Sequence, residues 1–537
     1  MNLKIFISVS VLLAGMAAAA QDTTKRKTIE ITSSFKPALK PSAKINFNPA
    51  ALGQDTSRPR LTYRVPVQNL SFNIFPASLK PAAMQPDTTV PYANGGYAKL
   101  GFGNFKTPYG AAGISFGDGK NSSGSVQGSY ISSKGKLPFQ QYTKWDVQGN
   151  GLVAAGANHK LALNAGIDQY TTHKYGYQPS TLTFAKDDLL QRFTTVGVGA
   201  AFSNNLPTDL GLSYAPEMNF WLFKDNNSGK EAHLHFNAPI QKELGENFVF
   251  GLTLQGDFVN YDGLRYSAKN NLVSITPSVT WKNENLVLKA GVMPSWNNSD
   301  FKILPDIELE AHIPDQPFMA IAGWKGYFDI NSYRNMAAFN PWIAQPKDVF
   351  NTRNTEIYAG IKGNLGEHFS YMAKVGAVGR RNVALFMNDS TDGKTYYVRD
   401  EPKVNSVKLQ GEISYQQADR FYWNAGFKAQ SFGGLKTYDK AYGLIPLEIN
   451  SHVRARIIKD LYLTADLFYF EGNWYRTRLI QGKTKTAFDL NAGLEFKVVD
   501  HVSVWLQFNN VFNNTYQRWQ QYPVLGFQAL GGVKFTF

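Results

Sequence analysis

The strictest constraint in this sequence is a two-residue alternation of apolar and polar side chains near its C-terminus, between Phe488 and Phe537. From residue 488 to 498 every second side chain is apolar, which is the period of a β-strand and about the length of a tilted strand that crosses a bilayer. Residues 499–501 leave room only for a hairpin turn, and a second alternating run follows at 502–509. One face of these strands is apolar and the other carries charge. They therefore belong either to a soluble sandwich or to a membrane barrel whose apolar face meets lipid.

The N-terminus favours the barrel. Lys4, an apolar run from Ile5 to Ala14 and the small residues Ala18 to Ala20 predict a signal peptide over residues 1–20, cleaved before Gln21. The rest of the chain has no apolar run long enough to cross a membrane as a helix. An exported chain of apolar-faced strands indicates a bacterial outer-membrane barrel, so we expect it in the cell outer membrane of a Gram-negative bacterium.

Composition agrees with this assignment. The chain has no cysteine, which excludes disulfides and thiolate metal sites. Aromatic residues make up 14% and charged residues only 18%, a balance typical of barrels with aromatic girdles. The formal net charge is +14, but no Lys/Arg-rich run is present, so we expect no nucleic-acid partner.

Residues 95–537 predict an all-β, transmembrane antiparallel β-barrel of about 22 strands, within a range of roughly 20–24. Short and long connections tend to alternate. Ten are short, such as 119–124 and 459–460, and eight of the remaining eleven are clearly long: 132–142, 173–192, 261–271, 331–354, 380–405, 432–445, 471–485 and 513–523. Short turns are periplasmic and long loops external in such barrels, so Phe537 is expected on the periplasmic side. The weakest strand pair, 97–105 with 110–116, also fits a hairpin inside the lumen.

Residues 21–94 differ in character. They are rich in proline from Pro37 to Pro91, and proline at this density blocks both helix and sheet ladder. We expect an extended periplasmic segment here, with a flexible leader as the alternative.

Alternation also assigns faces. On the lipid face, one Lys or Arg at the midplane would cost roughly 2–4 kcal/mol, so charged positions are expected to face a wet lumen. The polar side chains expected in the lumen are Lys408, Glu412, Lys428, Glu448, His452, Arg454, Arg456, Asp489, Glu495, Lys497 and Lys534.

The end of the chain resembles the last hairpin of TonB-dependent receptor barrels of the Bacteroidota type. The resemblance covers an Asn-x-Phe-x-Asn-x-Tyr stretch, a Tyr-Pro-x-x-Gly-Phe segment and a terminal aromatic, at Asn510, Phe512, Asn514, Tyr516, Tyr522, Pro523, Gly526, Phe527 and Phe537. It implies an outer-membrane transporter. Family members place a plug domain before the barrel, whereas residues 21–94 are too short and proline-rich to resemble one. Within them, Thr28, Ile29, Glu30, Ile31 and Thr32 resemble a TonB box, an extended segment that pairs with a strand of TonB.

Three kinds of side chain could carry chemistry. His233 and His235 share one strand face, which suits a metal site, but we favour an ordinary polar wall. The long loops mix aromatic residues with Lys and Arg. These aromatics are expected either to form an interfacial girdle or to contact a sugar, lipopolysaccharide phosphate or a protein. No nucleophile-elbow pattern is present, so we expect neither an enzyme nor a cofactor.

Two functions remain close. The first is a channel or transporter of the TonB-dependent-receptor-like class, which moves a solute through a polar lumen. The second is a non-transporting scaffold, bound to a periplasmic or lipoprotein partner through the N-terminal segment or the external loops. Expected partners are the outer membrane, lipopolysaccharide and TonB. A lumen of this width must be closed, by inward-folding loops, by residues 21–94 or by a partner.

Overall fold

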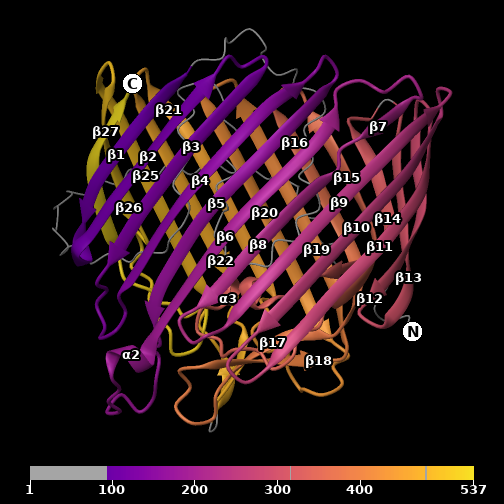
Figure 1. Cartoon of the computed structure of the whole chain (residues 1–537). Helices are drawn as coiled ribbons and strands as arrows, with labels where there is room; N and C mark the ends of the chain where they lie inside the picture. Colours follow the sequence, from indigo (N-terminus) through magenta and orange to yellow (C-terminus); the bar gives the residue numbers. More distant parts are fainter. Residues whose placement is uncertain (1–93, 315, 478–479) are drawn as a thin grey trace, which may run out of the picture. The chain divides into compact units, whose positions relative to one another are not determined.

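The computed structural model describes residues 94–314, 316–477 and 480–537, which form a closed antiparallel β-barrel (Figure 1). In its first half the strands of the barrel wall are β1 (Gly95–Gly103), β2 (Thr107–Gly117), β3 (Ser122–Ser133), β4 (Tyr142–Ala155), β5 (His159–His173), β6 (Leu190–Asn204), β7 (Leu212–Tyr214), β8 (Glu217–Asp225), β9 (Lys230–Leu244), β10 (Phe248–Asp262), β11 (Ser267–Lys282) and β12 (Leu286–Asn297). The second half of the wall consists of β13 (Asp300–His312), β14 (Phe318–Asp329), β15 (Thr352–Leu365), β16 (Phe369–Arg381), β19 (Val404–Gln417), β20 (Phe421–Gly433), β21 (Leu447–Ile458), β22 (Leu461–Phe470), β25 (Ala487–Val499), β26 (Val502–Asn509) and β27 (Gln528–Thr536).

The strand number agrees with the sequence prediction. β7 and β8 both pair with β9, and residues 215 and 216 between them interrupt what is one spanning strand. Pro216 has no N–H to donate to the ladder, which accounts for a break at this point. Counted in this way, the described part of the chain holds a barrel of 22 strands.

The first and last strands close the barrel. β1 pairs with β27 from Tyr97↔Thr536 to Gly103↔Leu530, and with β2 on its other side. The backbone N–H of Gly96 also donates to the carbonyl of Phe537 over 2.6 Å. The weak pair at 97–105 and 110–116 therefore lies in the wall, and its alternative placement as a hairpin inside the lumen is wrong.

Short turns gather at one end of the barrel and longer loops at the other (Figure 1). We call these the short-turn end and the long-loop end. Glycine permits several of the turns, with φ of 76° at Gly156, 65° at Gly245 and 64° at Gly366. One expected long loop is not long: β10 and β11 stay paired as far as Asp262↔Ser267, so residues 261–271 contain only a tight turn. The sequence predicts a loop here because the polar residues at the ends of β10 and β11 resemble loop residues.

The connections at the long-loop end hold the remaining elements. These are η1 (Asn104–Lys106), α2 (Lys186–Leu189), α3 (Tyr333–Phe339), the hairpin of β17 (Val383–Asn388) and β18 (Tyr396–Glu401), and the small hairpin of β23 (Trp474–Arg476) and β24 (Gln481–Lys483). No helix among the described residues is long and apolar enough to span a membrane.

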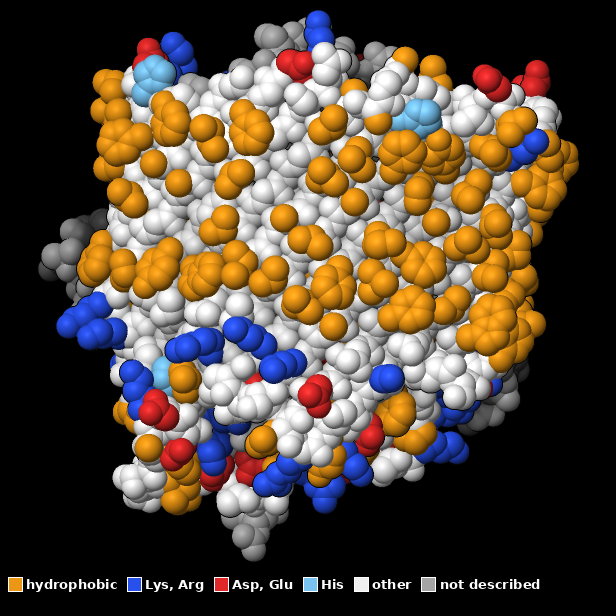
Figure 2. Space-filling model, viewed as in Figure 1, with side chains coloured by type: hydrophobic (Ala, Val, Ile, Leu, Met, Phe, Trp, Pro, Cys, Tyr) orange, Lys and Arg blue, Asp and Glu red, His pale blue; other side chains and the backbone are white. Residues whose placement is uncertain are grey.

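The outer face is apolar in a broad band. Side chains such as Val407, Ile357 and Val375 are at least half exposed, while the residue before each of them, on the other face, is buried. On the face drawn in Figure 2, apolar side chains spread across the wall and charged ones gather mostly beyond them, toward the long loops. A barrel with this outer band lies in the outer membrane, and its other face encloses the lumen. The expected signal peptide, proline-rich segment and TonB-box-like residues fall outside the described residues.

Candidate functional site

The lumen wall carries charged side chains, many of them paired across strands. The predicted residues Lys408, Lys428, His452 and Lys534 contact acidic partners on neighbouring positions of the inner face. The pairs are Lys408–Glu356 (2.6 Å), Lys428–Glu448 (3.7 Å), His452–Asp466 (2.6 Å) and Lys534–Glu495 (2.9 Å). The same pattern continues in Lys289–Asp306, Lys325–Glu308 and Lys362–Glu310, at 2.5–2.7 Å. The wall is therefore polar but close to neutral along this stretch.

Other residues of the predicted set lie differently. Glu412 accepts a hydrogen bond from the Asn424 amide over 2.9 Å, and the Arg454 guanidinium lies 5.4 Å from the centre of the Tyr462 ring. Asp489 is buried and accepts from the Tyr516 hydroxyl over 2.9 Å.

Arg456 and Lys497 lie at the short-turn end instead of deep in the lumen. Arg456 contacts Asp419 at 2.8 Å, and Lys497 contacts Asp500 at 2.6 Å. Both acids lie in turns, so these two cations belong to the rim of the barrel.

The two histidines of β9 belong to a hydrogen-bonded wall. Nε2 of His233 and Nδ1 of His235 both lie 2.9 Å from the same carboxylate oxygen of Asp257 on β10. No group of three or more His, Cys, Asp or Glu in the described ranges is arranged to hold a metal ion.

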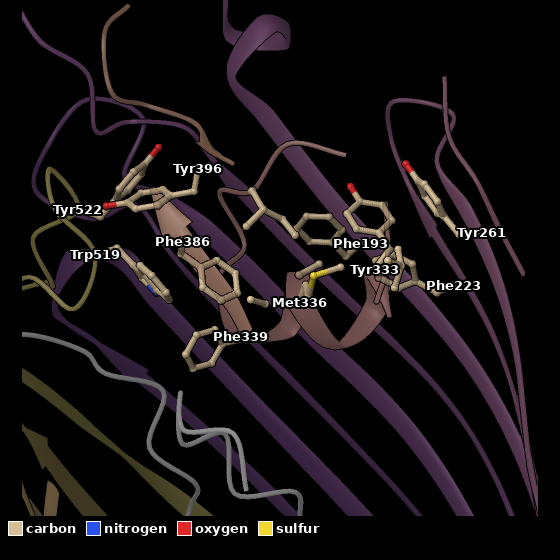
Figure 3. Packing of buried hydrophobic residues seen from close by; sticks show 14 residues of the cluster. Phe193, Phe223, Tyr261, Tyr333, Met336, Phe339, Phe386, Tyr396, Trp519 and Tyr522 are labelled. Atoms are coloured by element: carbon tan, nitrogen blue, oxygen red, sulfur yellow. The ribbon is translucent and has the colours of Figure 1, made fainter. Parts of the chain in front are cut away.

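Three loops from different parts of the ring meet at the long-loop end. They are the α3 loop between β14 and β15, the β17–β18 hairpin between β16 and β19, and the last loop between β26 and β27. Their buried side chains pack into one cluster, shown in Figure 3, which we call the loop cover: Tyr333, Met336, Phe339, Ile343, Phe386, Tyr396, Trp519 and Tyr522. The cover packs against Phe193, Phe223 and Tyr261 of β6, β8 and β10. Because β9 to β14 lie between β8 and β15, the α3 loop reaches well across the ring.

Helix α3 is fixed to the wall at its first turn. Ser332 caps it, its hydroxyl accepting from the backbone N–H of Asn335 over 3.1 Å. The Tyr333 backbone N–H donates to Glu231 of β9 over 2.5 Å, and its hydroxyl donates to Asp225 of β8 over 2.7 Å. Two carboxylates of the inner wall therefore hold the start of the helix.

The three loops hold one another through aromatic rings. The Trp519 ring lies 5.2 Å from each of Phe339, Phe386 and Tyr396, centre to centre. Trp342 stacks on Tyr522 at 3.8 Å. Arg518 lies 4.2 Å from the Trp519 ring and donates to the Gly443 carbonyl over 2.9 Å. Burial lowers the pKa of Arg518 to about 10, so it stays protonated at neutral pH.

The β17–β18 hairpin is tied to the next loop by one carboxylate. Glu401 accepts backbone N–H bonds from Lys403, Lys436, Thr437 and Tyr438, at 2.7–3.3 Å. Burial alone would raise the pKa of Glu401, but these donors outweigh burial and leave the pKa below its usual value. Burial, reinforced by Asp348, raises the pKa of the neighbouring Asp400 to about 6.

The C-terminal motif organises the last loop. The Asn510 side chain accepts from the Asn514 backbone N–H over 2.8 Å and donates to its carbonyl over 2.9 Å. Phe488 and Phe512 stack at 4.9 Å, and the Phe527 backbone N–H donates to Asn513 over 3.0 Å. Tyr522 lies in the loop cover, its hydroxyl donating to the Lys394 carbonyl. The Pro523 carbonyl accepts from Tyr175 over 3.0 Å, and Phe537 closes the seam with β1.

The loop aromatics correct the sequence interpretation. Tyr333, Phe339, Tyr442, Tyr516 and Trp519 are each at most 7% exposed, so they neither line the membrane interface nor await a ligand at the surface. Tyr333, Phe339 and Trp519 pack in the loop cover because three loops converge, whereas Tyr442 lies in a second buried cluster and Tyr516 packs against Phe470. The mixture of aromatic and small residues at 333–343, beside a Ser N-cap, was the only signal in the sequence for this packing.

A barrel with an apolar outer band, a charge-paired lumen and a loop-covered long-loop end is an outer-membrane β-barrel. No known family model matches the sequence, and no curated protein matches it. Solved structures do. An FrpB iron transporter from Neisseria meningitidis (F5-1 variant) aligns with a TM-score of 0.65 at 12% identity, over 83% of each chain.

Two further solved structures agree. The siderophore receptor PirA from Acinetobacter baumannii has a TM-score of 0.61 at 11% identity, over 83% of this chain and 80% of its own. The ferripyoverdine receptor of the outer membrane of Pseudomonas aeruginosa has a TM-score of 0.59 at 11% identity, over 83% and 72%. At these identities the likeness establishes the fold, which is that of TonB-dependent receptor barrels.

Proposed function

We propose that this chain is an outer-membrane transporter of the TonB-dependent-receptor type, which passes a solute through its lumen when the loop cover opens. One observation carries the proposal: the long-loop end of a polar barrel is covered by loops that hold each other outside the strand ladder, through packed side chains and one short backbone bridge. Opening the cover breaks the bonds of Tyr333 to Glu231 and Asp225 but leaves the strand ladder intact, so the cover can act as a gate.

The proposed cargo and the proposed coupling to TonB rest on likeness to other proteins. The similar structures are named as an iron transporter and siderophore receptors, which makes ferric siderophores the first cargo to test. The resemblance of Thr28–Thr32 to a TonB box supports coupling through added strand pairing with TonB. In this proposal residues 21–94 take the place of a plug domain, after removal of residues 1–20, and precede the barrel of 95–537.

The alternative, a non-transporting scaffold bound to a periplasmic or lipoprotein partner, draws no support from a specific contact in the described ranges. A non-enzymatic role agrees with the similar structures, which are named as transporters and receptors.

A reversible lock on the loop cover tests the proposal. Ile343 of the α3 loop and Tyr396 of the hairpin pair as a parallel β-bridge, and bridge partners lie close enough for a disulfide. The chain has no cysteine, so the double variant Ile343→Cys/Tyr396→Cys carries only the engineered pair. Cells producing it should take up a ferric siderophore only after reduction. Each single-cysteine variant is the matched control and should ignore the reductant.

Uptake that is equal in the locked and reduced states would remove the gate from the mechanism. Absence of uptake for a full panel of ferric siderophores, with the reduced protein correctly folded, would remove this cargo class.

A further inference from the structure

The outer wall carries a row of basic side chains where the apolar band gives way to the long loops. Figure 2 shows Lys and Arg side chains gathered on that side of the apolar band. On the outer face they are Arg192 of β6, Lys224 of β8, Lys230 of β9 and Lys269 of β11, and further around the ring Arg353 and Arg381. Each occupies the strand position that alternates with a buried inner residue, for example Phe193 after Arg192 and Glu231 after Lys230.

Two pairs of these cations stand directly opposite each other. Lys224 of β8 is the register partner of Lys230 of β9, and Arg353 of β15 is the register partner of Arg381 of β16. Like charges directly opposite across a ladder destabilise it. The same unfavourable arrangement thus occurs twice, on separate parts of the ring and at the same end of the barrel.

No carboxylate of the described chain forms an ion pair with any of these four side chains. The acid nearest in register is Asp262, opposite Lys230, and its carboxylate accepts the Ser267 hydroxyl over 2.6 Å. Exposed cations at the short-turn end behave differently: Lys282, Arg456 and Lys497 contact Glu243, Asp419 and Asp500 at 3.6, 2.8 and 2.6 Å. At the long-loop end itself, Lys302 and Lys483 contact Asp300 and Glu471 at 2.5 and 2.7 Å. The lack of an acidic partner is therefore a property of these four side chains.

A depression of about 300 Å³ adjoins Lys224 of the first pair. Its lining residues are Trp145, Ile167, Gln169, Arg192, Thr194, Lys224, Asp225 and Asn226, with one carboxylate beside two cations. The Trp145 indole donates to Gln169 over 3.4 Å, and the Gln169 amide donates to Thr194 over 3.1 Å. An indole, amides and cations beside each other suit a headgroup that joins sugar to phosphate.

Apolar side chains lie immediately below both pairs. Leu222, two residues from Lys224, is 49% exposed, and Ile357, four residues from Arg353, is 58% exposed. A ligand held by the cations would therefore place any attached hydrocarbon along the strands. This favours a lipid over a soluble anion.

We propose that the long-loop rim binds phosphorylated glycolipid headgroups of the outer leaflet, one phosphate bridging Lys224 and Lys230 and another bridging Arg353 and Arg381. A phosphate between two opposed cations turns their repulsion into two charge-assisted hydrogen bonds, and arginine can form them in pairs. The bound lipids are then structural partners of the barrel, independent of what it transports.

Binding is tested on the full-length protein in detergent, with bisphosphorylated lipid A and the same lipid freed of phosphate as probes. Native mass spectrometry should show at least tenfold weaker binding of the dephosphorylated lipid. Each of two double variants should lose the lipid bound at its own cation pair. The variants are Lys224→Gln/Lys230→Gln and Arg353→Gln/Arg381→Gln. The control Lys282→Gln/Arg456→Gln removes the same charge at the opposite end and should bind as the wild type does.

The unfolding temperature gives a second readout, which the same substitution should shift in opposite directions without and with lipid. Without lipid, Lys230→Gln should raise the unfolding temperature because a repulsion is removed. With bisphosphorylated lipid A, the same variant should unfold at a lower temperature than the wild type. The proposal is overturned if both lipids bind equally, if neither double variant loses lipid, or if millimolar inorganic phosphate displaces the lipid completely. Should one double variant fail to fold, the other pair decides.

Discussion

The Trp519→Ala variant is the sharpest test of the loop cover. The Trp519 side chain is 1% exposed and lies against rings from both other loops of the cover. Truncating a buried Trp to Ala typically costs about 3–5 kcal/mol, through lost burial and the cavity that remains. Because these contacts belong to loops, the cost should fall on the closed state of the cover and leave the strand ladder unchanged.

This free-energy cost to the closed state predicts how much more often the cover is open. Each 1.4 kcal/mol is about a tenfold change in an equilibrium constant, so the ratio of open to closed cover should rise by roughly a hundred- to several-thousand-fold. In a planar bilayer, single full-length barrels of the wild type should be mostly silent, and those of Trp519→Ala should show frequent, long openings.

Trp324→Ala is the matched control. It removes the same side chain from the outer face, where Trp324 is 46% exposed, and it should conduct as the wild type does. The reasoning is refuted if Trp519→Ala, with its folded barrel confirmed by heat-dependent mobility on a gel, opens no more often than Trp324→Ala.

Three further outcomes are expected. Tyr333→Phe removes the hydroxyl that donates to Asp225 over 2.7 Å, a bond to a charged group worth about 1.5–3 kcal/mol, so protease should cut the α3 loop faster while the barrel melts as before. Lys408→Met leaves Glu356 with only the more distant Lys374, at 3.8 Å; breaking a buried pair costs up to about 3–5 kcal/mol, so the urea midpoint should fall and adding Glu356→Gln should restore it. Acidification should change the stability of the β17–β18 hairpin in two stages, and the rate at which protease cuts the hairpin measures both. As the pH falls from 7 through about 6, protonation of Asp400, whose pKa is raised, should tighten the hairpin, and Asp400→Asn should abolish this stage. Below about pH 4, protonation of Glu401, whose pKa is lowered, should release it, and Glu401→Gln should show the release already at neutral pH.

The faces of the strands were predictable because alternation admits only one solution. In β19, Val407 and Leu409 face outward and Lys408 lies within reach of Glu356, as the two-residue period requires. A slip of one residue would place Lys408 in hydrocarbon. The same logic predicted the strand number and most turns. It failed at 261–271, where polar residues at strand ends looked like a loop although the ladder continues to Asp262↔Ser267.

The sequence by itself determined the barrel, since each strand carries its own signal in the side chains beside it. The direction in which the loops fold has no such local signal, because the aromatics of an inward loop and of an interfacial girdle look alike in one dimension. Phe339, Phe386 and Trp519 come from three separate loops and meet only because ring closure brings those loops over one lumen. The opposed cations at the long-loop rim likewise become pairs only when neighbouring strands fix their register.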